Sequence, residues 1–113
     1  TALGSRVVYT ILDIMQKENI VANAAEKGAY IVDQLRNKLA DQNVSVRGFG
    51  LMIGIELPKE CAELVAIARD EYKTIINVTA GNVVRLLPTL NITQEQADQL
   101  IERLVKMINA FLA

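Results

Sequence analysis

The chain lacks most of the side chains that metal sites and acid–base catalysts use. It has no histidine, which is the commonest metal ligand and a frequent general base. Its single cysteine, Cys61, can form neither an internal disulfide nor a cysteine-cluster metal site. Cys61 has helical spacing with Val65, Ala68 and Tyr72, so we predict that it faces the core. The sequence therefore predicts no metal site in this chain.

A charge excess of one sign and long apolar runs are also missing. Twelve basic residues stand against thirteen acidic ones, for a net charge of -1, and no basic cluster exceeds a pair. Nucleic acid is not expected as a partner, because phosphate binding needs a concentrated basic face. No apolar run approaches the roughly 18 residues that span a bilayer, and no signal-peptide pattern occurs. We predict a cytoplasmic protein without membrane contact.

What the chain has is the composition of one folded domain. Its 113 residues are 51% hydrophobic and 22% charged, which is typical of a soluble globular unit with a single core. Apolar residues recur with a helical period over residues 3–18 and again over 19–43, where Asn23 and Glu26 could cap a second helix. The same period over residues 94–113, after Thr93 and Gln96 at capping-box spacing, predicts a C-terminal helix.

Strand patterns occupy the middle of the chain. The stretch "VSVRGFGLMIGIEL", residues 44–57, predicts one long strand or two short ones with a glycine bend at 48–50. Pro58 is expected to open a short helix that contains Cys61 and closes near Tyr72. The runs "KTIINV" and "NVVRLLP" should pair antiparallel around "TAGN", where Gly81 and Asn82 can take a positive φ. The predicted fold is α+β, a small antiparallel sheet of three to four strands covered by helices.

Two of these stretches carry a resemblance to a known family. The run "VRGFGLMIGIEL", followed about thirty residues later by "INVTAGNVVRLLPTLNIT", resembles the C-terminal part of the class III pyridoxal-phosphate-dependent aminotransferases. The resemblance covers nearly the whole chain and is greatest to the acetylornithine type, which acts in arginine and lysine biosynthesis. It implies that residues 1–113 are one domain, the small domain of a homodimeric, cytoplasmic fold-type I enzyme.

The resemblance also implies that the catalytic parts lie outside this chain. The family holds pyridoxal 5'-phosphate (PLP) as a Schiff base on a lysine of a large domain, and its phosphate-binding threonine motif precedes the first helix. The lysines of this chain are expected to be solvated rather than to bind the cofactor: Lys17, Lys27, Lys38, Lys59, Lys73 and Lys106. We therefore expect the isolated chain to bind no PLP and to be inactive.

Arg85 is the candidate substrate-binding residue. It lies in the apolar run "NVVRLLP", where an arginine needs a partner. From the residues alone, a snorkelling or salt-bridged arginine is the commoner interpretation. The resemblance instead implies that Arg85 grips the α-carboxylate of glutamate or 2-oxoglutarate, whereas N-acetylornithine reacts at its far amino group. Arg47 is expected to form a structural ion pair, and Glu56 to be a structural or surface acid.

Two other classes of function remain open on the residues. A stand-alone amino-acid-binding regulatory domain without catalysis could use the same sheet and the same arginine. Such domains usually show a βαββαβ repeat, which this chain does not have. A pure oligomerisation module would favour an apolar strand without Arg85. The sequence favours the aminotransferase domain.

Overall fold

The computed structural model describes residues 2–49 and 52–113, and the side chains of 19–48 and 52–113. Its helices and strands, in chain order, are α1 (Ala2–Lys38), β1 (Ser45–Phe49), β2 (Met52–Glu56), α2 (Leu64–Glu71), β3 (Asn77–Thr79), β4 (Val83–Leu86) and α3 (Gln94–Leu112). The strands form one sheet in the order β1-β2-β4-β3, and every neighbouring pair is antiparallel. The predicted α+β class with a small antiparallel sheet is confirmed.

The N-terminal region forms one helix, so the prediction of two helices is wrong. Helix α1 continues from Ala2 to Lys38, because no proline or glycine interrupts the helical period around residue 20. Asn23, predicted to cap a second helix, lies inside α1, and its Nδ2 donates to the carbonyl oxygen of Ile92 at 3.0 Å. Within the described ranges, no helix is both long and apolar enough to cross a bilayer.

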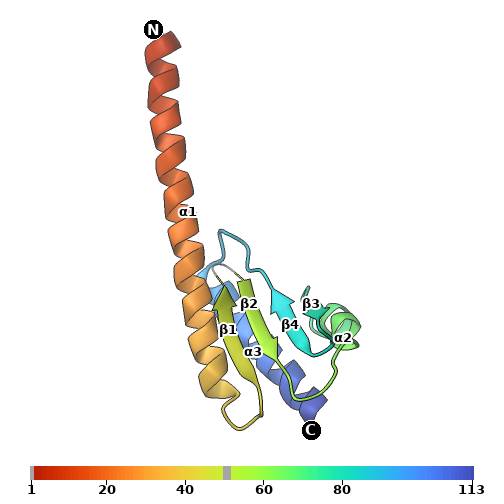
Figure 1. Ribbon diagram of the computed structural model, residues 1–113. Helices are drawn as coiled ribbons and strands as arrows, with labels where there is room; N and C mark the ends of the chain where they lie inside the picture. Colours follow the sequence, from red (N-terminus) through yellow and green to blue (C-terminus); the bar gives the residue numbers. More distant parts are fainter. Residues whose placement is uncertain (1, 50–51) are drawn as a thin grey trace.

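The helices cover one face of the sheet. Figure 1 shows α3 behind the sheet, α1 beside strand β1, and α2 beside strand β3. Successive side chains along each strand point to opposite faces of the sheet, so every second side chain faces the helices and is buried. The core joins these side chains to buried residues of α1 and α3: Val46, Ile53, Ile55, Val84 and Leu86 from the strands, Ile31, Leu35 and Leu39 from α1, and Ala97, Ile101, Leu104 and Ile108 from α3.

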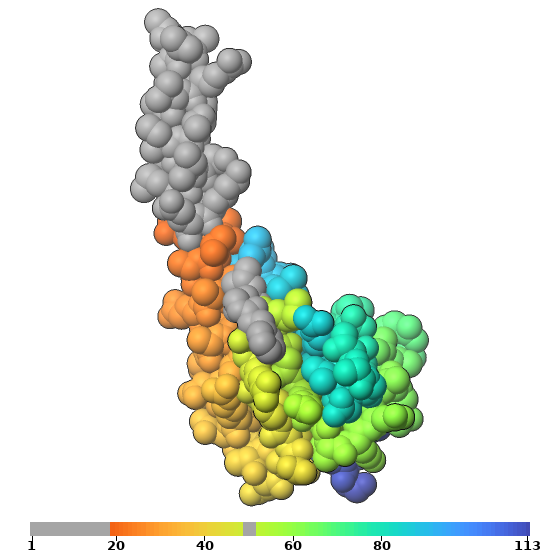
Figure 2. Space-filling view, in the orientation of Figure 1, coloured from red at the N-terminus to blue at the C-terminus, as the bar shows by residue number. Residues whose placement is uncertain are grey.

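The opposite face of the sheet, which we call the open face, carries the alternate residues of each strand. Figure 2 shows β1, β2 and β4 at the surface on the side away from α3. The open face is formed by Ser45, Arg47, Met52, Gly54, Glu56, Asn77, Thr79, Val83 and Arg85. Its composition is mixed and largely polar, unlike the buried face.

The capping box of the last helix is confirmed. The Oγ1 atom of Thr93 accepts a hydrogen bond from the backbone N–H of Gln96 at 3.1 Å, and Oε1 of Gln96 accepts from the backbone N–H of Thr93 at 3.0 Å. These two bonds satisfy backbone donors that the first turn of α3 cannot pair internally. The helix therefore starts one residue after Thr93, at the end of the loop that follows β4.

The start of the middle helix differs from the prediction. Helix α2 begins at Leu64, not at Pro58, and Cys61 lies in the loop before it. The backbone N–H of Cys61 donates to the carbonyl oxygen of Gly81 at 2.8 Å, so this loop is tied to the β3–β4 turn instead of being helical. In that turn the positive φ angles belong to Ala80 and Gly81, whereas Gly81 and Asn82 were predicted. Asn82 Nδ2 instead donates to the Leu57 carbonyl oxygen at 3.0 Å.

Cys61 faces the core, as predicted, with 0% of its surface exposed. Burial raises the pKa of its thiol, so the reactive thiolate forms only at higher pH than in a free cysteine. We expect Ellman's reagent at about pH 8 to react with the native chain roughly 100-fold more slowly than with the chain in guanidinium chloride. The denatured sample is the control. Equally fast reaction of both samples would contradict the buried position.

Candidate functional site

Arg85 projects from an interior strand onto the open face. Its neighbours along β4, Val84 and Leu86, are buried among the helices, whereas Arg85 is exposed. The register places Gly54 of β2 on one side of Arg85 and Asn77 of β3 on the other. Because hydrogen-bonded strands flank β4 on both sides, the backbone under Arg85 is fixed. The side chain of Arg85 therefore starts from a backbone position that does not change.

The guanidinium of Arg85 contacts a sulfur atom and, among the described side chains, no carboxylate. Its Nε and Nη2 atoms donate to Sδ of Met52, at 3.2 and 2.8 Å. A thioether is a weak acceptor, and a guanidinium has five N–H donors, so the described residues use only part of the hydrogen-bonding capacity of Arg85. Among the described side chains, none forms a salt bridge with Arg85. The salt-bridged interpretation of this arginine therefore finds no support there.

Arg47 shares a row with Arg85. Arg47 of β1 is paired with Gly54 of β2, and Gly54 is paired with Arg85 of β4. We call the four residues that cross the sheet at this level the arginine row: Arg47, Gly54, Arg85 and Asn77. Arg47 is exposed, and in the described part of the chain no acid lies within salt-bridge distance of it. The predicted structural ion pair of Arg47 is not found there.

Glu56 also lies on the open face, one row away from the arginine row. It is exposed and is paired in the register with Ser45 and Val83. Its carboxylate forms no salt bridge with any side chain that the structure describes. This position fits the predicted surface acid, and we assign Glu56 no chemical role.

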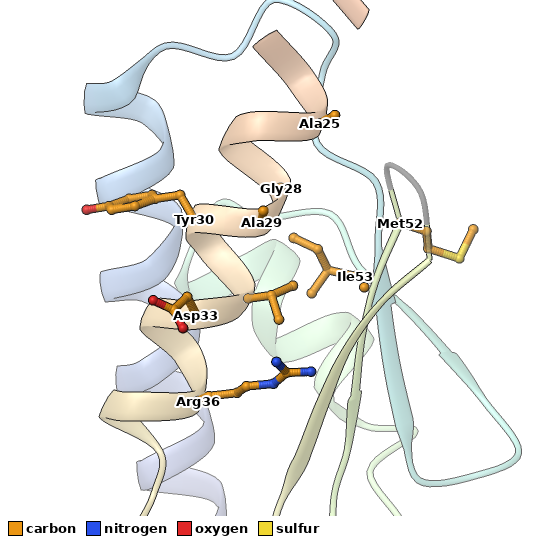
Figure 3. Close-up of a pocket in the computed structure, with 10 residues that line it drawn as sticks. Ala25, Gly28, Ala29, Tyr30, Asp33, Arg36, Met52 and Ile53 are labelled. Atoms are coloured by element: carbon orange, nitrogen blue, oxygen red, sulfur yellow. The ribbon is translucent and has the colours of Figure 1, made fainter. Parts of the chain in front are cut away.

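A groove of about 640 Å³ lies between helix α1 and the β1–β2 hairpin, as Figure 3 shows. Met52 borders this groove and also contacts Arg85, but neither arginine of the arginine row lines it. Two of its polar side chains are already engaged. Arg36 Nε donates to the Val46 carbonyl oxygen at 2.9 Å, and the Tyr30 hydroxyl donates to Asp98 Oδ1 at 2.7 Å.

The Tyr30–Asp98 bond joins α1 to α3, and it raises the pKa of the Tyr30 hydroxyl, because the carboxylate accepts the proton that Tyr30 donates. The charged side chains among the described lining residues of the groove are those of Asp33 and Arg36. We therefore place the candidate site on the open face and not in this groove.

The described lysines do not resemble a Schiff-base lysine, which needs a buried, desolvated amine. Lys38, Lys59, Lys73 and Lys106 are exposed, and Lys27 is half-buried. Two of them have partners at the surface. Lys59 Nζ lies 4.4 Å from the centroid of the Phe111 ring, and Lys106 Nζ lies 3.0 Å from Glu102 Oε1. The side chain of Lys17 lies outside the described residues.

Comparison with known proteins identifies the family. Residues 3–108 match the family model of Aminotransferase class-III. The chain belongs to the class III aminotransferases. This match covers the residues that carry the predicted resemblance, and it favours an enzyme domain over a stand-alone amino-acid-binding domain.

Several curated relatives are acetylornithine aminotransferases. Acetylornithine aminotransferase 1 of Bordetella parapertussis is 44% identical over 105 residues, which are 91% of this chain and 26% of that protein. Acetylornithine aminotransferase of Nitrosomonas europaea is 40% identical over 112 residues, which are 97% of this chain and 28% of that protein. The chain thus spans about a quarter of the length of these relatives.

Solved structures of the same family share the fold. Ornithine δ-aminotransferase of Plasmodium falciparum superposes with a TM-score of 0.75 at 32% identity, covering 88% of this chain and 27% of that one. Acetylornithine aminotransferase of Elizabethkingia anophelis gives a TM-score of 0.74 at 27% identity, covering 88% and 27% respectively. The arrangement of helices and strands is therefore that of one part of a larger aminotransferase.

Proposed function

We propose that this chain is the C-terminal small domain of an acetylornithine-type aminotransferase. The complete protein would transfer an amino group between N-acetylornithine, or a related ω-amine, and 2-oxoglutarate in arginine or lysine biosynthesis. It would act as a cytoplasmic homodimer. The names of the relatives support this activity. The observation that carries the proposal is the exposed guanidinium of Arg85, held on an interior strand of the open face without a carboxylate partner among the described residues.

Arg85 would bind the α-carboxylate of glutamate and 2-oxoglutarate. A guanidinium is planar, stays protonated, and can make two parallel hydrogen bonds to one carboxylate. Binding of this kind fixes both the position and the orientation of the carboxylate. The bond to be broken at the α-carbon is thereby aligned for reaction. Met52 would hold the guanidinium near this position before substrate arrives, because its sulfur is a weak acceptor that a carboxylate readily replaces.

The cofactor would be held by other parts of the complete protein. PLP is named in the structure of the ornithine aminotransferase of Toxoplasma gondii, which is 27% identical to this chain with a TM-score of 0.73. When bound, PLP supplies the electron sink that amino transfer requires. The described lysines of this chain are not suited to bind it, so we assign PLP no contact in this domain. The isolated chain would then be inactive.

The proposal predicts a specific activity for the complete protein. Purified with PLP, it should form glutamate from 2-oxoglutarate when N-acetylornithine is the amino donor, and comparison with ornithine and succinyl-diaminopimelate would rank the donors. The 113-residue chain alone should form no glutamate and give no aldimine absorption band with PLP. Failure of the complete protein to use any of these donors would overturn the proposed function, and a stoichiometric band with the short chain would place the lysine here.

A further inference from the structure

A second groove, of about 330 Å³, lies where the chain leaves β4 and where it enters β3, against helix α3. We call it the end groove. Its apolar lining includes Ile75, just before β3, and Leu87, just after β4, together with Pro88 and with Leu100 of α3. Arg85 does not line it. The end groove is thus formed by the segments that flank the strands and not by the strands themselves.

The apolar side chains of the end groove are unusually exposed. Ile75 is 80% exposed and Leu87 is 64% exposed, the two highest values among the large hydrophobic residues that the structure describes. Leu90, in the loop that follows β4, is 47% exposed. Single apolar residues are common on protein surfaces, but a cluster of them around a groove marks a contact with another protein surface.

The walls of the end groove are fixed within the domain. Thr74 is buried, and its backbone N–H donates to the carbonyl oxygen of Ala68 at 2.9 Å, which anchors the segment that carries Ile75 to the end of α2. On the other wall, the backbone N–H of Ile92 donates to the carbonyl oxygen of Thr89 at 3.1 Å. A surface that is already ordered loses little conformational entropy when a partner binds.

The rim of the end groove is positively charged. Lys73 and Arg103 line it, and its described lining residues include no acid. Neither cation forms a salt bridge with a side chain in the described part of the chain. An apolar centre with a polar rim is the usual anatomy of a contact between protein surfaces. The end groove therefore suits a segment that carries an apolar side chain beside a carboxylate, whereas a small anion alone would leave Ile75 and Leu87 exposed.

The rest of a longer polypeptide is available to fill the end groove. The chain spans about a quarter of the length of its acetylornithine aminotransferase relatives. Figure 1 shows helix α1 extending beyond the sheet at the end where β4 finishes, and the bond from Asn23 to Ile92 ties α1 to the loop after β4. Residues that precede α1 in the complete protein would therefore lie on the same side of the domain as the end groove.

We propose that the end groove binds a segment of the complete polypeptide that lies outside residues 1–113. This segment places an apolar side chain against Ile75 and Leu87 and a carboxylate between Lys73 and Arg103. The inference rests on the proposed function, in which the chain is one domain of a longer protein, and it adds the surface by which this domain is attached. The end groove is then covered in the complete protein and open in the isolated chain.

Thiol labelling measures whether the end groove is covered. In the complete protein, the cysteine of Ile75→Cys is expected to react with N-ethylmaleimide at least about 30-fold more slowly than the cysteine of Glu102→Cys. Glu102 is the matched control, because its side chain is 65% exposed on α3 and does not line the end groove. Peptide mass spectrometry assigns the reaction to each residue. If the two rates are equal while the complete protein still forms glutamate from N-acetylornithine and 2-oxoglutarate, the proposed function stands and this inference fails.

A photo-cross-linker identifies what fills the end groove. With p-benzoylphenylalanine in place of Leu87, the complete protein should form a cross-link to a peptide outside residues 1–113, and the product should keep the mass of one chain on a denaturing gel. A product with the mass of two chains would show that a second copy occupies the groove, which overturns the proposal. The absence of any cross-link would overturn it as well.

Reversal of the rim charge tests the carboxylate of the bound segment. In the complete protein that carries Ile75→Cys, the added pair Lys73→Glu and Arg103→Glu is expected to raise the labelling rate at residue 75 about 3- to 10-fold, because like charges then face each other. Arg103→Lys keeps the charge and should change this rate by less than about twofold. An unchanged rate after charge reversal would contradict the proposed carboxylate.

Discussion

Replacing Arg85 by glutamine in the complete enzyme is expected to lower kcat/KM for 2-oxoglutarate about 100- to 10,000-fold. The variant loses two charge-assisted hydrogen bonds to the α-carboxylate, and each such bond is worth roughly 1.5 to 3 kcal/mol. Arg85→Lys should lose about 10- to 100-fold, because an ammonium keeps the charge but not the planar fork. Steady-state kinetics with varied 2-oxoglutarate at fixed amino donor measures both losses.

Protein stability provides the control for this experiment. Arg85 is exposed and forms no salt bridge with the described side chains, so its replacement should shift the free energy of unfolding by less than about 0.5 kcal/mol. A variant that melts at the wild-type temperature but has lost activity points to the substrate contact. Unchanged kcat/KM with the keto acid would remove Arg85 from the site.

The second prediction concerns protein stability and the hydrophobic core under strands β2 and β4. Ile55 of β2 is 0% exposed and sits next to Gly54 in the chain, on the buried face. Ile55→Ala is expected to destabilise the chain by about 2 to 5 kcal/mol, because the change removes buried methylene groups and leaves a cavity between the sheet and the helices. Urea unfolding followed by circular dichroism measures the loss. Since domains are typically stable by only about 5 to 15 kcal/mol, the loss is a large fraction of the total.

A matched control lies in the loop before β3. Ile75 is 80% exposed, so Ile75→Ala removes the same atoms from a position that makes little contact within this domain. The free energy of unfolding of the Ile75→Ala variant of the 113-residue chain should stay within about 0.5 kcal/mol of the wild-type value. Equal destabilisation by the two substitutions would show that the described core does not hold this sheet together.

Local signals in the sequence predicted the last helix and the strands within residues 44–57 and 82–88, whereas the predicted strand over residues 73–78 begins only at Asn77. Thr93 and Gln96 are in the spacing that a capping box needs, and the structure has both of its hydrogen bonds. The single helix α1 was missed because a possible cap at Asn23 does not end a helix when the residues on both sides favour helix. Contact with the loop at Ile92 gave the Asn23 side chain a different partner, and such a contact between distant residues leaves no local signal.

The candidate site was only partly readable from the sequence. Arg85 could be found because a permanent charge in an apolar strand demands an explanation, and the family resemblance supplied one. Gly54 and Met52 could not be associated with it, since that requires knowing that β4 pairs with β2 and in which register. A shift by one residue would move every side chain of a strand to the other face.

The two edges of the sheet bear on how the chain behaves at high concentration. An open strand edge can pair with the edge of another molecule and start aggregation. Strand β1 has helix α1 beside it, and Arg36 Nε donates a hydrogen bond to the Val46 carbonyl oxygen. Strand β3, at the other edge, has only three residues and lies beside α2. Neither edge is a long flat template, so self-association through added strands is disfavoured.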